Sequence, residues 1–204
     1  MCQLFRDNTI MKNKNRLEAF SDGVLAIIVT IMVLELKVPE TMGWQGIANN
    51  WFSYSSYALS FFAVGLYWKA HSYLFEFVES INDNSFLLGL VSLFFVSFLP
   101  YATKMVNEHN MAKTSVAFYA GILVLNNITY FLMVRQLRKI HDEDSQYVKT
   151  FASDYRSIFT LFANLLCGLI ALMGFPKIGF FSIFVIYLFW IIPHHQFEKF
   201  FYKK

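Results

Sequence analysis

The residues best placed to do chemistry lie between Arg16 and Pro39, where charged side chains flank an apolar stretch. Twelve uncharged residues separate Asp22 from Glu35, which is about 18 Å of α-helix, whereas the hydrocarbon core of a bilayer is about 30 Å thick. A charge facing lipid costs roughly 2.5–3.5 kcal/mol or more, so both carboxylates need protein or water around them. The segment is therefore predicted to be a membrane helix that other helices shelter or that lines a wet path.

Helical spacing gives this segment a distinct apolar face. With Ile27 placed at 0° and steps of 100° per residue, Ile31 falls at about +40°, Leu34 at about −20° and Thr30 at about −60°. The face is thus apolar apart from one hydroxyl group. Spacing alone favours ordinary packing against lipid or core for this face, with the lining of an ion path as the alternative.

Ser21 and Asp22 fall on the opposite side of the same helix, at about 120° and −140°. The favoured interpretation of Asp22 is a buried structural acceptor of hydrogen bonds, and a direct ion or proton ligand is the alternative. A buried acid is stable only when it is paired and hydrogen-bonded. Arg16, Trp68 and His71 are the expected partners, since all three fall at the cytoplasmic side of the predicted topology.

The composition indicates a polytopic membrane protein. Of 204 residues, 56% are hydrophobic and 15% charged, and the mean hydropathy is +0.44, whereas soluble domains are about a quarter charged. The net charge of +3 is not arranged as a basic patch with interleaved aromatics, so nucleic acid is not an expected partner. The two cysteines, Cys2 and Cys167, lie far apart in the sequence and indicate neither a disulfide framework nor a metal motif, and Cys167 is expected to be a small core residue.

Six apolar runs predict six transmembrane helices in an all-α chain. The third is expected to kink or end at Pro100, and Pro176 with Gly179 is expected to join the last two in a tight hairpin. Five spans with a re-entrant segment are the less favoured alternative. The runs are roughly 18–37, 50–69, 85–104, 115–134, 157–175 and 178–193.

The distribution of lysine and arginine predicts the orientation. Thirteen of these residues fall on the side of the two termini and four on the other, which puts both termini in the cytoplasm. Residues 1–16 lack the apolar core of a signal peptide. Residues 1–204 are interpreted as one integral domain, in the plasma membrane of a prokaryote.

Four landmarks in order resemble the TMEM175 family in its short prokaryotic form. Residues 16–22, RLEAFSD, match its RxxxFSD signature, and residues 23–39 are close to its first helix. Residues 68–71, WKAH, resemble its WxxH element, and residues 85–101 resemble its proline-ended third span. The likeness therefore covers the first half of the chain, and the six-span layout fits the whole.

The resemblance implies a passive potassium-selective channel, a homotetramer whose central pore is lined by the first helix of each subunit. By motif position, Ile27, Ile31 and Leu34 form a hydrophobic constriction, with Thr30 implicated in selectivity. The motif residues tie the first helix to its neighbours: Arg16, Phe20, Ser21, Asp22, Trp68 and His71. No catalysis and no cofactor are implied beyond permeant K⁺, and the partners are monovalent cations, the lipid bilayer and further copies of the chain.

Several alternatives remain beside this interpretation. Glu35 either concentrates cations at the outer mouth or pairs with Lys37. A proton-permeable channel or a proton-coupled transporter using Asp22 and His71 is the alternative function. An enzyme is disfavoured because residues 141–144, HDED, and 194–195, HH, lack metal-ligand spacing. The first of these segments is expected to be a salt-bridged surface.

Overall fold

The computed structural model describes residues 2–41, 43–151, 155–188 and 190, with side chains from residue 13 onward. The described chain is helical throughout, with connecting turns and loops but without strands. In order, the elements are α1 (Cys2–Met32), the 3-10 helix η1 (Val33–Glu35), α2 (Trp44–Asn49), α3 (Trp51–Phe77), α4 (Asp83–Ser97), α5 (Leu99–Glu108), α6 (Lys113–Arg138), α7 (Gln146–Thr150), α8 (Tyr155–Leu172) and α9 (Pro176–Leu188).

The predicted membrane character is confirmed. Four helical stretches of the described chain are long and apolar enough to cross a bilayer: 13–35, 83–108, 113–138 and 155–172. The second predicted span forms α3, whose 27 residues are long enough but whose serines and tyrosines reduce its hydropathy. The sixth forms α9, an apolar helix of 13 residues. The count of six spans therefore stays a prediction.

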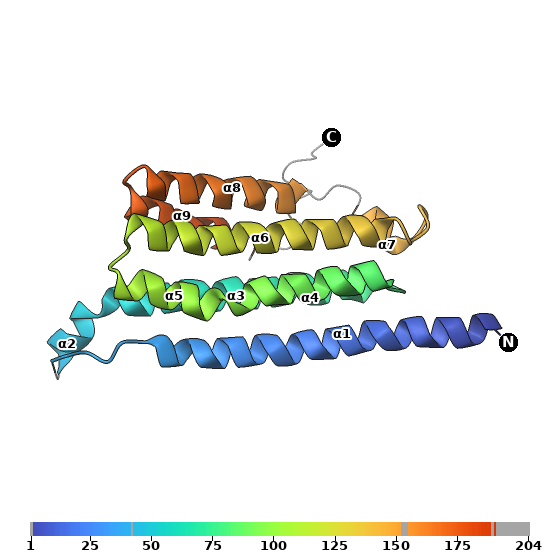
Figure 1. Cartoon of the computed structure of the whole chain (residues 1–204), viewed down its shortest axis with the longest axis horizontal. Helices are drawn as coiled ribbons and strands as arrows, with labels where there is room; N and C mark the ends of the chain where they lie inside the picture. Colours follow the sequence, from blue (N-terminus) through green and yellow to red (C-terminus); the bar gives the residue numbers. More distant parts are fainter. Residues whose placement is uncertain (1, 42, 152–154, 189, 191–204) are drawn as a thin grey trace.

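The helices lie side by side in layers (Figure 1). α8 and α9 form one edge, α6 lies next to them, α3 to α5 follow, and α1 forms the opposite edge. The central helix is the most buried. Half of the residues in the most apolar stretch of α6 are buried, but only 28% of those in the corresponding stretches of α1 and α8. α1 contacts α3, α4 and α5, so its remaining surface is free in the single subunit.

Pro100 kinks the third span without ending it, which is one of the two outcomes predicted from the sequence. α4 ends at Ser97 and α5 begins at Leu99, with Pro100 in the first turn of α5, where a missing N–H is tolerated. The Ala102 N–H donates to the Phe98 carbonyl at 2.9 Å, which carries the helix across the break. The combined stretch continues to Glu108.

The predicted hairpin between α8 and α9 is also confirmed. Gly174 adopts φ +104°, a backbone conformation that glycine provides without steric cost. α9 begins at Pro176, and its Gly179 lies directly against α8, where an added Cβ would be 2.5 Å from the Cys167 carbonyl oxygen. Cys167 is a buried core residue with a free thiol, as expected.

The interior of the subunit is hydrogen-bonded as well as apolar. The Ser60 hydroxyl lies 2.7 Å from that of Thr103 and 3.0 Å from that of Tyr119, so it joins α3 to α5 and α6. One turn earlier on α3, Ser56 donates to the Asn107 side chain. Because lipid offers helices little hydrophobic reason to associate, such buried polar contacts help to hold a membrane bundle together.

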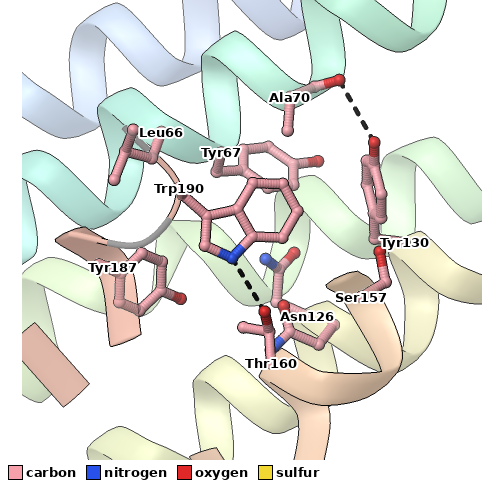
Figure 2. A pocket seen from close by; sticks show the side chains of 10 residues that line it. Leu66, Tyr67, Ala70, Asn126, Tyr130, Ser157, Thr160, Tyr187 and Trp190 are labelled. Atoms are coloured by element: carbon pink, nitrogen blue, oxygen red, sulfur yellow. Dashed lines mark hydrogen bonds between the residues drawn. The ribbon is translucent and has the colours of Figure 1, made fainter. Parts of the chain in front are cut away.

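A second group of polar side chains lines a small cavity between α3, α6, α8, α9 and residue 190 (Figure 2). The Trp190 indole N–H donates to the Thr160 hydroxyl at 2.8 Å, and the Tyr130 hydroxyl donates to the Ala70 carbonyl at 3.3 Å. The first bond joins residue 190 to α8, and the second joins α6, at the centre of the bundle, to α3. The cavity lies within one subunit, away from α1.

Candidate ion-conducting face of the first helix

α1 has two distinct faces. One is buried against α3, α4 and α5 and recurs every three or four residues, which fits the helical repeat. Its members are at most 4% exposed: Leu17, Ser21, Leu25, Ile28 and Met32. Sequence spacing thus correctly separated Ser21 from the Ile27 face.

The other face is uncovered and largely apolar. Ile27 is 59% exposed and Ile31 42%, Leu34 in the adjoining η1 is 77% exposed, and Phe20 continues the same face toward the N-terminus. Thr30 is exposed between them and donates its hydroxyl to the Ile27 carbonyl at 2.8 Å, which leaves the hydroxyl oxygen able to accept or to approach a cation. The structure therefore brings all four predicted pore residues onto one continuous face.

Ser21 and His71 tie α1 to α3 on the covered side. The Ser21 hydroxyl donates to the Leu17 carbonyl at 2.7 Å and lies 3.5 Å from His71 Nε2. His71 is fully buried and stacks on Phe75 with ring centroids 4.5 Å apart. The contact with His71 places Ser21 on the side of α1 that faces α3, away from the exposed face.

Asp22 was predicted to be buried, and that prediction is wrong for the single subunit. Its side chain is exposed and accepts a hydrogen bond from the Trp68 indole N–H at 2.8 Å. Trp68 was one of three expected partners; among the described residues, no ion pair joins Asp22 to the exposed Arg16. The carboxylate is at the edge of the α1–α3 contact, so α3 covers it only partly.

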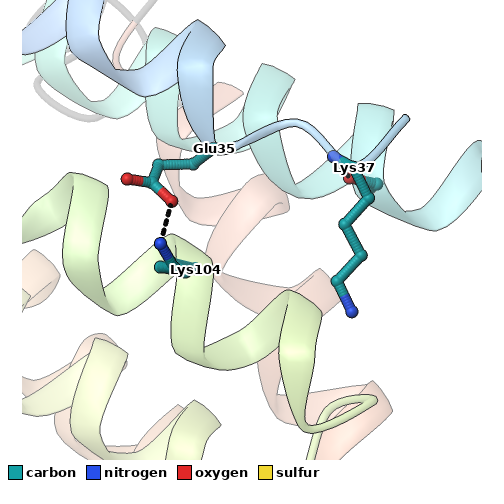
Figure 3. Close-up of polar contacts among 4 residues, drawn as sticks. Glu35, Lys37 and Lys104 are labelled. Atoms are coloured by element: carbon teal, nitrogen blue, oxygen red, sulfur yellow. Dashed lines mark hydrogen bonds and ion pairs between the residues drawn. The ribbon is translucent and has the colours of Figure 1, made fainter.

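The other end of α1 is fastened by two lysines (Figure 3). Lys104 Nζ lies 3.0 Å from Glu35 Oε2, whereas Lys37 Nζ donates to the Asn107 backbone carbonyl at 3.3 Å. The expected alternative pairing of Glu35 with Lys37 is therefore wrong. Sequence reasoning missed Lys104 because it belongs to a distant part of the chain and no local spacing links it to Glu35.

The histidine-rich segments offer no metal site within the part of the chain that the structure describes. His141 accepts the Glu79 N–H at Nε2, at 3.1 Å, and its Nδ1 lies 2.8 Å from the Leu137 carbonyl. Asp144 pairs with Lys149 at 3.6 Å. This is the salt-bridged surface predicted for residues 141–144, while His194 and His195 lie outside the described residues.

Comparison with known proteins identifies relatives of this arrangement. The sequence profile described as endosomal/lysosomal potassium channel TMEM175 matches residues 16–100. A potassium channel of Chryseobacterium sp. (strain P1-3) is 35% identical over 186 residues, which are 91% of this chain and 96% of that protein. The endosomal/lysosomal proton channel TMEM175 of Gallus gallus is 32% identical over 136 residues, but the match covers only 27% of its length.

A solved structure agrees over almost the whole fold. The crystal structure of a lysosomal potassium-selective channel TMEM175 homolog from Chamaesiphon minutus superposes with a TM-score of 0.73 at 25% identity. The superposition covers 88% of this chain and 97% of that one. Since the Chryseobacterium relative also matches over nearly its full length, the chain belongs to the TMEM175 family.

Proposed function

We propose that this protein is a potassium-selective channel that conducts K⁺ passively across the plasma membrane. The observation that carries the proposal is the uncovered apolar face of α1, which the protein's own subunit leaves exposed while it buries the opposite face. The names of the bacterial relatives, potassium channels in each case, support the choice of ion. The exposed face is proposed to line a pore and not to form a catalytic site.

In the proposed assembly, residues 1–204 form one membrane domain and four copies surround a central axis. Each copy crosses the membrane six times, with α1, α3, α4 joined to α5, α6, α8 and α9. The excess of lysine and arginine beside the termini supports a cytoplasmic location for both. As an edge helix, α1 is free to meet its copies at the axis.

The mechanism we propose is a hydrophobic constriction. Rings of Ile27, Ile31 and Leu34 narrow the path, and a narrow apolar ring excludes water and so gates by dewetting. Potassium sheds its hydration shell more readily than sodium, which favours K⁺ where coordination is sparse. The Thr30 hydroxyl supplies part of the lost coordination.

The motif residues orient this face and do not bind the ion. Ser21 and His71 set the rotation of α1, and the hydrogen bond from Trp68 to Asp22 holds its cytoplasmic end to α3. Arg16 and Phe20 are exposed at that end, where they contact neighbouring subunits or lipid headgroups in the proposed tetramer.

Proton permeation is a second candidate function, because the Gallus gallus relative is named an endosomal/lysosomal proton channel. A related alternative is proton-coupled transport that uses Asp22 and His71. A carrier gives flux that depends on a counter-ion and saturates with substrate, whereas a channel gives passive current that follows each ion's own gradient.

Ion flux in reconstituted liposomes tests the proposal. We expect K⁺-driven flux to exceed Na⁺-driven flux in the wild type, and we expect Ile27→Asn to raise both and to bring their ratio toward unity. Ile128→Asn is the matched control, because it places the same amide at an exposed site on α6. A ratio unchanged by Ile27→Asn, with the variant folded, refutes the constriction, and proton flux without K⁺ flux favours the second candidate.

A further inference from the structure

The ion pair between Glu35 and Lys104 is placed where it controls charge at one end of the proposed pore. Glu35 ends η1, directly after the apolar face of α1, and Lys104 approaches it from α5. The nitrogen–oxygen distance is 3.0 Å, and the side chains are 44% exposed for Lys104 and 22% for Glu35. Both charges are therefore partly exposed, where the end of η1 meets α5 (Figure 3).

The charged side chains around the Glu35–Lys104 pair are of both signs, so the net charge of this region is close to zero. Lys37 is two residues beyond Glu35 and is turned to the Asn107 carbonyl, and the exposed Glu40 follows in the same loop. Glu108, also exposed, is one helical turn beyond Lys104 on α5. Only Lys104 makes an ion pair with Glu35 among the described residues, so the carboxylate closest to the apolar face is the one that is compensated.

We infer that Lys104 sets the electrostatic potential at the outer mouth of the pore by neutralising Glu35. The inference rests on the proposed function, because it needs α1 to line the path. A ring of four free carboxylates would raise the local cation concentration and favour entry from outside, whereas four neutral pairs leave entry close to bulk conditions. Lys104 thereby makes conduction nearly independent of surface charge, although it does not line the path itself.

Replacing Lys104 by glutamine leaves the four Glu35 carboxylates of the proposed tetramer without their counter-charges. Four unit charges about 10 Å from the axis raise inward conductance by about two- to fivefold at 20 mM salt, where the screening length is roughly 20 Å. At 0.5 M salt the gain is less than about 1.5-fold because the screening length falls to roughly 4 Å. Outward current changes less, so the current–voltage curve becomes asymmetric only at low salt.

The experiment is a recording of K⁺ currents from the full-length protein in planar bilayers at 20 mM and 0.5 M KCl. We expect Lys104→Gln to produce inward rectification at 20 mM that disappears at 0.5 M, and Glu35→Gln to produce the opposite asymmetry. The double variant is expected to return to the wild-type curve. Lys177→Gln is the matched control, since it removes an exposed lysine on α9, at the edge of the bundle away from α1.

Two outcomes overturn the inference. Symmetric currents at 20 mM in both single variants mean that the pair does not influence entry, and equal rectification in Lys177→Gln means that the effect is general surface charge. Glu35→Gln keeps the inference falsifiable if Lys104→Gln does not fold. Failure of the proposed function gives a different result, namely no K⁺ current in the wild type or no response to Ile27→Asn.

Discussion

Gly179 determines how closely α8 and α9 pack, and Gly179→Ala is the perturbation with the most clearly defined cost. An added Cβ would lie 2.5 Å from the Cys167 carbonyl oxygen and 3.3 Å from the Ala171 Cβ. Ordinary van der Waals contact begins near 3.4 Å, so the two helices have to separate by about 0.9 Å along that line. The obstacle is backbone, which does not rotate out of the way.

The expected cost follows from two opposing effects. Overpacking of a well-packed interface costs roughly 1–3 kcal/mol, and the higher helix propensity of alanine offsets up to about 1 kcal/mol of that. We therefore expect Gly179→Ala to lower the free energy of unfolding by about 1–2 kcal/mol. For a chain of this length that is a fall in apparent melting temperature of about 2–8 °C.

Two other glycines are matched controls for Gly179. Gly65 and Gly121 also lie within helices, but an added Cβ at either has nothing within 4 Å in the subunit. Gly→Ala at these sites is expected to leave stability unchanged or raise it slightly. Gly89 is intermediate, because its obstacle is the end of the flexible Leu17 side chain at 2.9 Å.

The buried thiol of Cys167 provides the assay. Only two cysteines occur in the chain, so Cys2→Ser leaves Cys167, which is 3% exposed, as the single reporter. A thiol-reactive fluorescent dye then reports the temperature at which α8 and α9 open in detergent. A melting temperature for Gly179→Ala at or above those of Gly65→Ala and Gly121→Ala refutes the reasoning, because the helix separation would then not be limited by this contact.

Two further predictions concern hydrogen bonds. Trp68→Phe removes the donor to Asp22 and is expected to lower the free energy of unfolding by at most about 1.5 kcal/mol in the melting assay. Trp44→Phe, at a site that is 86% exposed, is the control and should change the free energy of unfolding by under about 0.5 kcal/mol. Equal shifts would contradict a role for the bond. Ser60→Ala and Tyr119→Phe are each expected to cost about 1–3 kcal/mol because partners stay buried without a bond. The double variant should cost less than the sum of the two in the same melting assay, and strict additivity would show that the two hydroxyls do not interact.

Local periodicity was sufficient to predict the two faces of α1. The 100° step placed Ile27, Ile31 and Leu34 together and Ser21 away from them, and the structure exposes the first three and buries the fourth. Proline likewise predicted the kink at Pro100 and the hairpin at Pro176, because its backbone limits act locally, whereas the turn glycine, Gly174, was not among the predicted residues. Such features depend on residues within a few positions of one another.

Features that depend on distant residues were not predictable. The end of α1 at Met32, with η1 up to Glu35, is earlier than the predicted end at residue 37. Burial of Asp22 was predicted wrongly because its exposure depends on how far α3 extends over it. The Lys104 partner of Glu35 depends on the packing of α5 against α1, which no pattern within either helix encodes.

The separation of Glu35 from Lys104 along the chain has a consequence for biogenesis. α2, α3 and α4 must be synthesised before Lys104 exists, and the neighbouring contact from Lys37 to Asn107 spans 70 residues. At about 5–20 residues per second, the ribosome needs roughly 4–14 s to cover that interval. For part of this time Glu35 has left the ribosome while Lys104 has not yet been synthesised, so its carboxylate needs water as its partner until α5 is made.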